Sequence, residues 1–310
     1  MKTAEDVWLR WLLHDRNGGD VAIEQAIRAE VAGYVDRLLD AAQVRPGMTL
    51  LDVGTGEGAV AFQAIERFGP DLRVILTDVS EPLLERARAK ADSLGLLDQC
   101  SFVAASADEF TTIADGSVDV VTSRAALAYV PDKLSALKEF WRILRPDGRI
   151  SLAEPIFQDE AFEACVLRTL VQKEAGRGGD SLRPLLHRCK AAQFPDTPEA
   201  VAQNFLTNFS ERSLFAQTRS CGFWPIHLEL HVDLTPALIN SWDAFLNTSP
   251  HPLAPTLELI LSEQFDARER GIFEAALRPL VESGCAPSVV RIAYLSATRR
   301  QLSVPTLVEI

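Results

Sequence analysis

The chain has 310 residues, of which 47% are hydrophobic and 24% charged, and this composition excludes a disordered or fibrous chain. Forty-three acidic residues against 31 basic ones give a net charge of −12. Because phosphate neutralisation drives nucleic-acid affinity, this charge disfavours nucleic acids and anionic membranes as partners. The length allows one large domain or two small ones.

The cysteines and the N-terminus point to a reducing compartment. Five widely spaced cysteines without a Cys-x-x-Cys pair favour free thiols over a disulfide framework or a structural zinc site. The N-terminus, MKTAEDVWLRWLLHDRN, carries acids early, and Arg10 interrupts its short apolar run. No later run reaches the roughly 18 apolar residues of a membrane span. We therefore expect no signal peptide, no membrane partner and a cytoplasmic location.

Residues 1–45 are expected to form an N-terminal helical lid. Helices are predicted over 1–16 and 21–42, separated by two glycines, with Asp20 as the N-cap of the second. In the second helix, apolar residues recur at three-to-four spacing and form one face: Ile23, Ile27, Val31, Tyr34, Val35 and Leu38.

Residues 46–155 alternate between short apolar runs and amphipathic segments. This rhythm predicts strand–helix–strand units, a parallel sheet and helices on both of its faces. The predicted strands are 49–53, 73–77, 100–104, 118–122 and 149–153, and the predicted helices are 58–68, 81–94 and 132–144.

The rhythm stops after residue 156. Residues 156–214 are predicted to be a helical cap insertion, interrupted at Gly176–Gly179. Residues 215–310 supply two further strands, near 225–234 and 288–296, around a second helical insertion at 236–286. The expected fold is therefore α/β: a Rossmann-like, doubly wound, mostly parallel seven-stranded sheet with a lid and helical caps.

The segment LLDVGTGEGA, residues 50–59, ends a predicted strand, turns on glycines and opens a helix. Glycine permits the tight turn and lets backbone N–H groups approach a ligand closely. Taken alone the motif is ambiguous, because Gly54-x-Gly56-x-x-Ala59 also fits the dinucleotide fingerprint. A nicotinamide cofactor therefore stays open at this point.

Asp52 helps to separate the two ligands. It lies two residues before the first glycine, where it would face a pyrophosphate. Two like charges about 4 Å apart cost roughly 1 kcal/mol in water and more in a cleft. A ligand with an ammonium and a sulfonium, such as S-adenosylmethionine, would instead be attracted. The alternative role for Asp52 is to cap or brace the turn.

Asp78 closes the next strand, about 20 residues after Gly58. A carboxylate at this place can accept both ribose hydroxyls of a nucleoside, so it supports an adenosine ligand without choosing between the two cofactors. Val79 follows and is placed to cover one face of the adenine. The alternative for Asp78 is an ordinary turn residue.

Five motifs in order then suggest a family. Residues 50–156 resemble class I S-adenosylmethionine-dependent methyltransferases, particularly the small-molecule branch with the ubiquinone-biosynthesis and sterol enzymes. The resemblance lies in LLDVGTGEG, LTDVSEPLLERARAKA, FVAASADEF, DGSVDVVTSRAALAYVPD and LRPDGRISLAEP. Each motif alone is weak evidence for the family, but all five occur in the family's order and spacing, and this combination is specific.

The resemblance implies roles for the residues of the first two motifs. Gly54, Thr55 and Gly56 would pass under the methionine portion of S-adenosylmethionine. Asp52 would hold the ammonium directly or through water, and Asp78 would bind the ribose.

The later motifs depart in part from the family pattern. Ser106 stands where the family usually has an acid that contacts the adenine amino group, and the backbone N–H of Ala107 would meet the ring. A hydroxyl can accept the same bond without charge assistance. Ser123 and Arg124 are expected in the turn after the fourth strand, where backbone carbonyls approach the ammonium. Pro146–Asp147–Gly148 is expected to form a type I turn in place of Pro-Gly-Gly.

The expected positions of Glu154, His14 and His187 in the fold make them candidate catalytic residues. Glu154 ends the fifth strand beside the donor site and is the first candidate for contacting or deprotonating an acceptor. An ion pair with Arg124 that braces the loops is its alternative role. His14, in the expected lid, and His187, in the first insertion, are further candidate bases.

No metal is expected. His227 and His231 share one face of a predicted strand, but no third ligand is evident, and two surface histidines explain the spacing better.

The function expected from these residues is methyl transfer from S-adenosylmethionine to oxygen, nitrogen or carbon of a small metabolite in specialised metabolism. S-adenosylhomocysteine would be the product, and a small-molecule acceptor the partner. One alternative is a binding protein or a non-methylating cyclase that uses the same donor site. The other is an NAD-dependent oxidoreductase. The acceptor and the oligomeric state do not follow from the sequence.

Overall fold

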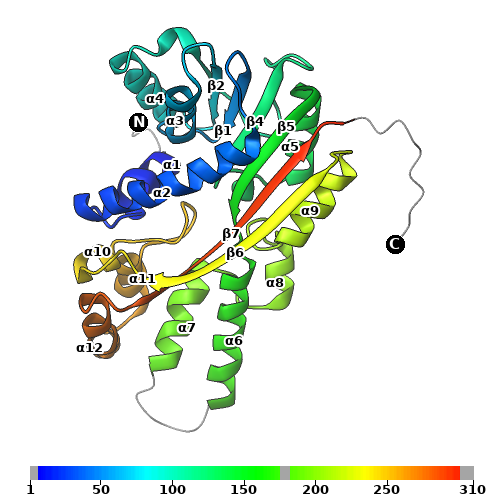
Figure 1. The fold of residues 1–310 in the computed structure, drawn as a ribbon. Helices are drawn as coiled ribbons and strands as arrows, with labels where there is room; N and C mark the ends of the chain where they lie inside the picture. The colour runs from blue at the N-terminus through cyan, green and yellow to red at the C-terminus, as the bar shows by residue number, and fades with distance from the viewer. Residues whose placement is uncertain (1–5, 175–181, 301–310) are drawn as a thin grey trace, which may run out of the picture. The chain divides into compact units, whose positions relative to one another are not determined.

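A seven-stranded sheet carries the glycine motif (Figure 1). The structure is a computed structural model that describes residues 6–174 and 182–300. The strand order is β3-β2-β1-β4-β5-β7-β6; β1 to β5 run parallel, and β7 is antiparallel to β5. The strands are β1 (Thr49–Val53), β2 (Arg73–Asp78), β3 (Cys100–Ala104), β4 (Val118–Arg124), β5 (Leu144–Pro155), β6 (Ile226–Pro236) and β7 (Pro287–Thr298). The predicted α/β, Rossmann-like, mostly parallel seven-stranded sheet is confirmed.

The chain divides into two units, each described by itself. The sheet unit consists of residues 32–155, 210–231 and 292–310, and the helical unit of residues 1–31, 156–209 and 232–291. The predicted boundaries at 45, 155 and 214 and the roles of lid and cap stay predictions.

Burial of the central strands explains why the sheet forms. In β1, Leu50 and Leu51 are both fully buried although their side chains point to opposite faces, which is the pattern of a parallel strand covered on both sides. The helices that lie wholly within the sheet unit are α3 (Ala59–Phe68), α4 (Glu81–Ser93), α5 (Lys133–Ile143) and α9 (Glu211–Ser220). The unit also contains the 3-10 helices η2 (Leu97–Gln99) and η3 (Leu127–Tyr129).

The predicted end of the fourth strand was wrong. β4 continues through Arg124, so Ser123 and Arg124 are its last two residues and do not form the turn that follows. Ser123 pairs with Val53 of β1, and Arg124 with Ala153 of β5. Ladder pairing on both sides therefore extends the strand beyond the predicted end.

The predicted type I turn at Pro146–Asp147–Gly148 has a different form. β5 begins at Leu144, but its register with β4 shifts between Leu144 and Arg149, so these residues form an irregularity inside the strand. Asp147 has a φ of 62°, which lies outside a type I turn. The reason is a partner distant in sequence: Asp147 donates its N–H to the Arg299 carbonyl at 2.8 Å. Gly148 in turn accepts from the Arg299 N–H at 2.7 Å, which draws the segment into the sheet.

The helical unit has its own apolar core. Trp242, Ile260, Leu261 and Phe273 are each less than 9% exposed and pack in one cluster. Among the described residues, no helix combines the length and apolar character needed to cross a membrane. The helices of the helical unit are α1 (Val7–Arg10), the π-helical η1 (Trp11–Asp15), α6 (Gln158–Glu174), α7 (Leu182–Gln193), α8 (Pro198–Gln203), α10 (Trp242–Leu246), α11 (Leu257–Gln264) and α12 (Ala267–Glu282).

The N-terminal helices differ in part from their prediction. α2 (Val21–Ala42) matches the predicted range, and Asp20 accepts from the Ala22 and Ile23 N–H groups, as an N-cap does. The first predicted helix begins only at Val7, and part of it is π-helical. Residues 1–5 and the predicted interruption at Gly176–Gly179 lie outside the described residues.

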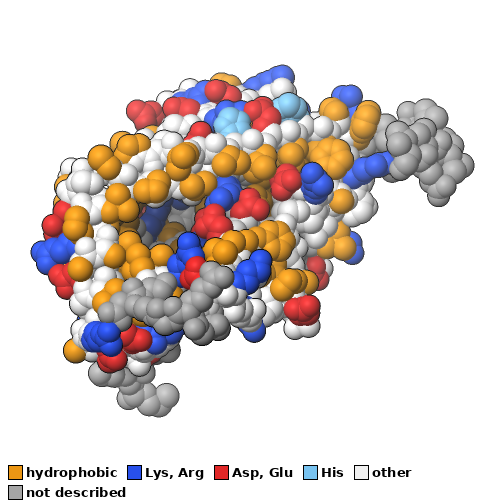
Figure 2. Space-filling model, turned by 90° about the horizontal axis from the view of Figure 1, so that it is seen from below, with side chains coloured by type: hydrophobic (Ala, Val, Ile, Leu, Met, Phe, Trp, Pro, Cys, Tyr) orange, Lys and Arg blue, Asp and Glu red, His pale blue; other side chains and the backbone are white. Residues whose placement is uncertain are grey.

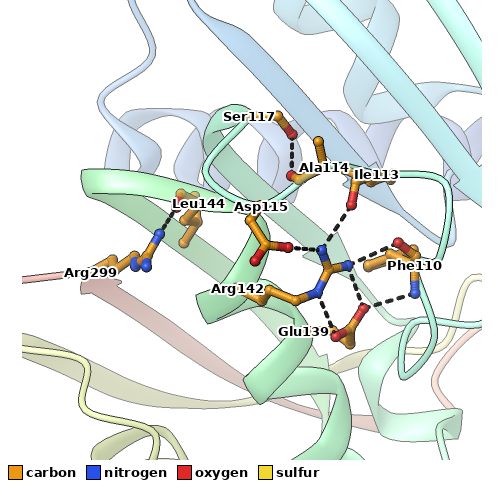
Figure 3. Close-up of polar contacts among 9 residues, drawn as sticks. All are labelled: Phe110, Ile113, Ala114, Asp115, Ser117, Glu139, Arg142, Leu144 and Arg299. Carbon is orange, nitrogen blue, oxygen red and sulfur yellow. Dashed lines mark hydrogen bonds and ion pairs between the residues drawn. The ribbon is translucent and has the colours of Figure 1, made fainter.

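On the face drawn in Figure 2, acidic and basic side chains are scattered among hydrophobic ones. A network of hydrogen bonds and ion pairs, drawn in Figure 3, joins α5 to the segment before β4. The Arg142 guanidinium donates to the carbonyls of Phe110 and Ile113, both at 2.9 Å, and to the carboxylates of Asp115 and Glu139. Arg142 thereby fixes the connection between β3 and β4.

Arg142→Met should lower the free energy of unfolding by about 1–3 kcal/mol, because it leaves buried carbonyls and Glu139 without their donor. Urea unfolding followed by circular dichroism would measure this. Arg145→Met is the control. Arg145 forms an ion pair with Asp119 near the surface, so its loss should cost less than about 1 kcal/mol. Equal losses for the two variants would contradict the special role of Arg142.

Candidate functional site

A buried carboxylate lies beneath the glycine turn at the end of β1. Asp52 is 1% exposed, and its oxygens accept from the hydroxyls of Thr55 at 2.7 Å and Thr122 at 2.9 Å. Burial raises the pKa of Asp52 to about 6, although both hydroxyls and the Arg124 charge act against the rise. Asp52 therefore braces the turn, the role weighed as its alternative, and adds negative charge beneath it.

The turn above Asp52 exposes backbone. Gly54 is exposed with a φ of +61°, and a Cβ built on it would lie 2.3 Å from the Cβ of Ala126. Thr55 donates its N–H to the Thr77 carbonyl at 2.9 Å, which ties the turn to the end of β2. Only glycine fits at residue 54, so the surface over β1 stays open to a ligand.

Asp78, the last residue of β2, is hydrogen-bonded to the same glycine turn. Its carboxylate accepts from the N–H of Gly56 at 2.8 Å and from the N–H of Ser80 at 3.0 Å, and the residue is 7% exposed. Ser80 then caps α4 through the Leu83 N–H. Val79 is 54% exposed beside it. Asp78 thus links the glycine turn to the start of α4 and lies where the ribose role was predicted.

Ser106 has a charged neighbour that the sequence reasoning missed. Its hydroxyl donates to the Asp108 carboxylate in a short hydrogen bond, while Ala107 between them is 6% exposed. The acid that the family pattern places at position 106 is thus present two residues later. The signal was readable in the motif SADEF, where Asp108 follows Ser106 at a spacing typical of a local turn.

Glu154 holds the loop after β4. It is fully buried; one carboxylate oxygen accepts from the Ser123 hydroxyl at 2.6 Å. The other accepts from the N–H groups of Ala126 at 3.1 Å and Ala128 at 2.9 Å. Burial raises the pKa of Glu154, and these hydrogen bonds oppose the rise. The recorded contacts are those of a loop brace; the predicted contact with an acceptor stays a prediction.

Lys133 is a second residue that the sequence reasoning missed. It is 4% exposed and donates to the Val130 carbonyl at 2.9 Å. Burial lowers its pKa to about 8, and the Glu154 carboxylate opposes this shift. A lysine in the first position of a helix is unfavourable to the helix dipole, and that was the available signal.

The candidate histidines belong to the helical unit or to β6. His14 is an exposed residue of η1 in the helical unit, and His187 is hydrogen-bonded to Asp196 at 2.9 Å in the same unit. His227 and His231 both bond Glu229, at 2.8 and 3.1 Å. Within residues 6–174 and 182–300, no group of three or more His, Cys, Asp and Glu side chains is arranged to hold a metal.

Comparisons with known proteins agree with the geometry. A family profile described as a methyltransferase domain matches residues 45–190. The chain is 42% identical over 120 residues to nocamycin O-methyltransferase of Saccharothrix syringae, a match covering 39% of this chain and 42% of that protein. It is 30% identical over 173 residues to the ubiquinone/menaquinone biosynthesis C-methyltransferase UbiE of Klebsiella pneumoniae, covering 54% of this chain and 68% of the relative.

Among solved structures, YcgJ of Bacillus subtilis is similar with a TM-score of 0.52 at 15% identity. That match covers 87% of this chain and 99% of YcgJ. At this identity the likeness concerns the fold alone.

Asp52→Asn should stabilise the protein at pH 7. A shift of the Asp52 pKa from 3.8 to about 6 corresponds to about 3 kcal/mol of cost for burying the charge. Because asparagine carries no charge, we expect a gain of about 1–3 kcal/mol in the free energy of unfolding. The gain is full above pH 6 and shrinks as the pH falls towards 4, since the folded wild type then binds a proton that its unfolded chain does not.

Urea unfolding between pH 4 and pH 8 would measure this difference. Asp92→Asn, at an exposed position on α4, is the control and should change little. A stability difference independent of pH would show that Asp52 is not buried as a charge.

Glu154→Gln should loosen the loop after β4. The glutamine NH2 would face either the N–H groups of Ala126 and Ala128 or the Ser123 hydroxyl, which now donates to the carboxylate, and the charge would be lost. About 1–3 kcal/mol of stability should therefore be lost. Hydrogen exchange of these two amides should speed up by about 5–100-fold. Ser123→Ala, which removes one hydroxyl bond only, should have the smaller effect. Unchanged exchange in Glu154→Gln would refute the brace.

Proposed function

Because the chain belongs to the class I S-adenosylmethionine-dependent methyltransferases that include UbiE, we propose that it uses S-adenosylmethionine to methylate a small-molecule acceptor. S-adenosylhomocysteine would be the second product. The observation that carries the proposal is the buried Asp52 carboxylate beneath the exposed Gly54 turn. Negative charge there attracts a cationic nucleoside and repels a pyrophosphate.

The residues present fit this donor. Gly54 leaves backbone open where the methionine portion would lie, and Asp52 supplies the charge for its ammonium at a distance or through water. Asp78, at the end of β2, would bind the ribose. Val79, Ser106 and Ala107 would surround the adenine, with Asp108 giving the Ser106 hydroxyl charge assistance.

The donor brings a methyl group already activated by the sulfonium. The main task of the chain is therefore alignment, which can supply on the order of 7–11 kcal/mol when the reacting geometry is held. The braced loop after β4 serves that task, because Glu154 fixes its backbone at the end of the strand next to β1. Glu154 and His14 are the candidates for taking a proton from the acceptor.

We propose an oxygen, nitrogen or carbon atom of a metabolite as the methyl acceptor, in specialised metabolism. One relative is named an O-methyltransferase of nocamycin and another a C-methyltransferase of quinone biosynthesis, which supports a small molecule and leaves the acceptor atom open. The matching segment spans less than half of the first of these relatives. A cytoplasmic location and the lack of nucleic-acid and membrane partners are part of the same proposal.

Calorimetry with S-adenosylhomocysteine and with NAD tests the donor. Binding of the first and not of the second is expected, and the reverse would favour an oxidoreductase. If a candidate metabolite is turned over, a gain of one methyl group in mass together with released S-adenosylhomocysteine would separate transfer from a non-methylating cyclase or binding protein.

Asp78→Asn should weaken S-adenosylhomocysteine binding by about 10–100-fold, because it removes charge-assisted bonds to the ribose. Calorimetry should be repeated with an analogue that lacks both ribose hydroxyls, for which the variant should lose little. Asp92→Asn is the matched control. Equal losses with the two ligands would mean that Asp78 acts only by holding Gly56.

A further inference from the structure

Arg124 is the last residue of β4. It is half-buried, and within the described residues the structure records no hydrogen bond or ion pair of its guanidinium. Burial lowers its pKa, whereas the charges of Asp52 and Glu154 and the nearby Tyr129 oppose the shift. A guanidinium has five N–H donors, and desolvating them without acceptors is costly. The side chain is therefore suited to binding an anionic ligand.

The sheet register places this cation beside the glycine turn. Asp52 pairs with Thr122, and Val53 pairs with Ser123, so Arg124 continues β4 alongside Gly54. Side chains two residues apart on a strand share a face. Arg124 therefore lies on the face of Thr122, whose hydroxyl bonds the Asp52 carboxylate at 2.9 Å. One positive and one negative group thus occupy the same face next to the exposed turn.

The other carboxylate near Arg124 is already engaged. Both oxygens of Glu154 accept from Ser123 or from the loop N–H groups, and Asp52 accepts from two threonine hydroxyls. These groups lower the electrostatic cost of the buried cation and leave its donors for a ligand. Arg124→Gln should accordingly fold, since it breaks no hydrogen bond or ion pair recorded among the described residues.

We propose that Arg124 binds the α-carboxylate of the donor's methionine portion, while Asp52 attracts its ammonium. This inference rests on the donor site proposed above. A zwitterionic α-amino acid end carries both charges on one carbon, and the pair of opposite charges matches it. The planar guanidinium can bind a carboxylate through two parallel hydrogen bonds, which fixes orientation as well as affinity. An anionic oxygen of the acceptor is the other possible source of the same chemistry.

The test compares two ligands on the full chain by calorimetry: S-adenosylhomocysteine and its decarboxylated analogue. Arg124→Gln should lose about 10–100-fold in affinity for S-adenosylhomocysteine and less than about threefold for the analogue. Arg124→Lys should recover part of the difference, because it keeps the charge without the planar fork. Arg145→Gln, at a surface ion pair of the same unit, should leave both affinities unchanged.

Equal losses for the two ligands would overturn the inference, because the residue would then act through the fold. No loss for either ligand would overturn it as well. If the unchanged protein bound neither ligand, the donor site itself would be refuted, which is a separate and recognisable failure.

Discussion

The burial of one carboxylate, Asp52, shapes the rest of the site. An ionised group without water needs hydrogen-bond donors, and the chain provides the hydroxyls of Thr55 and Thr122 from the turn and from the neighbouring strand. These two bonds tie the turn to β4. The pKa of about 6 shows that the compensation is incomplete, so the site stores an electrostatic cost that a cationic ligand would relieve.

The same principle explains the carboxyl ends of the neighbouring strands. Asp78 holds the Gly56 N–H, and Glu154 holds the loop after β4, each by hydrogen bonds from backbone groups that would otherwise lack acceptors. Three carboxylates at or near the ends of β1, β2 and β5 thus fix the turn after β1 and the loop after β4. Rigid loops suit a reaction that depends on alignment, because the geometry is set before the ligand arrives.

Much of this could be predicted from the sequence, because it depends on local patterns. Apolar runs and glycines near 49–58 predicted β1 and its turn, and spacing singled out Asp52 and Asp78. The errors have long-range causes. β5 begins early because Leu144 pairs with Val118 of β4, and Asp147 and Gly148 bond Arg299, about 150 residues away in the chain. The partners of Glu154 likewise come from another strand, and no local pattern encodes that it faces loop N–H groups.

The aromatic residues of the insertions show why the acceptor is harder to infer than the donor. Trp242 is 6% exposed and stacks on Phe245, and Phe209 is 1% exposed, so packing explains their presence in the helical unit. A helical core requires such residues whatever its substrate, and their spacing therefore carries no chemical information. Charged groups differ in this respect. The burial of Asp52 and the half-burial of Arg124 are unfavourable for stability, and ligands of opposite charge would offset that cost. If the acceptor is recognised through apolar contacts, the residues that bind it cannot be distinguished in the sequence from residues of the apolar core.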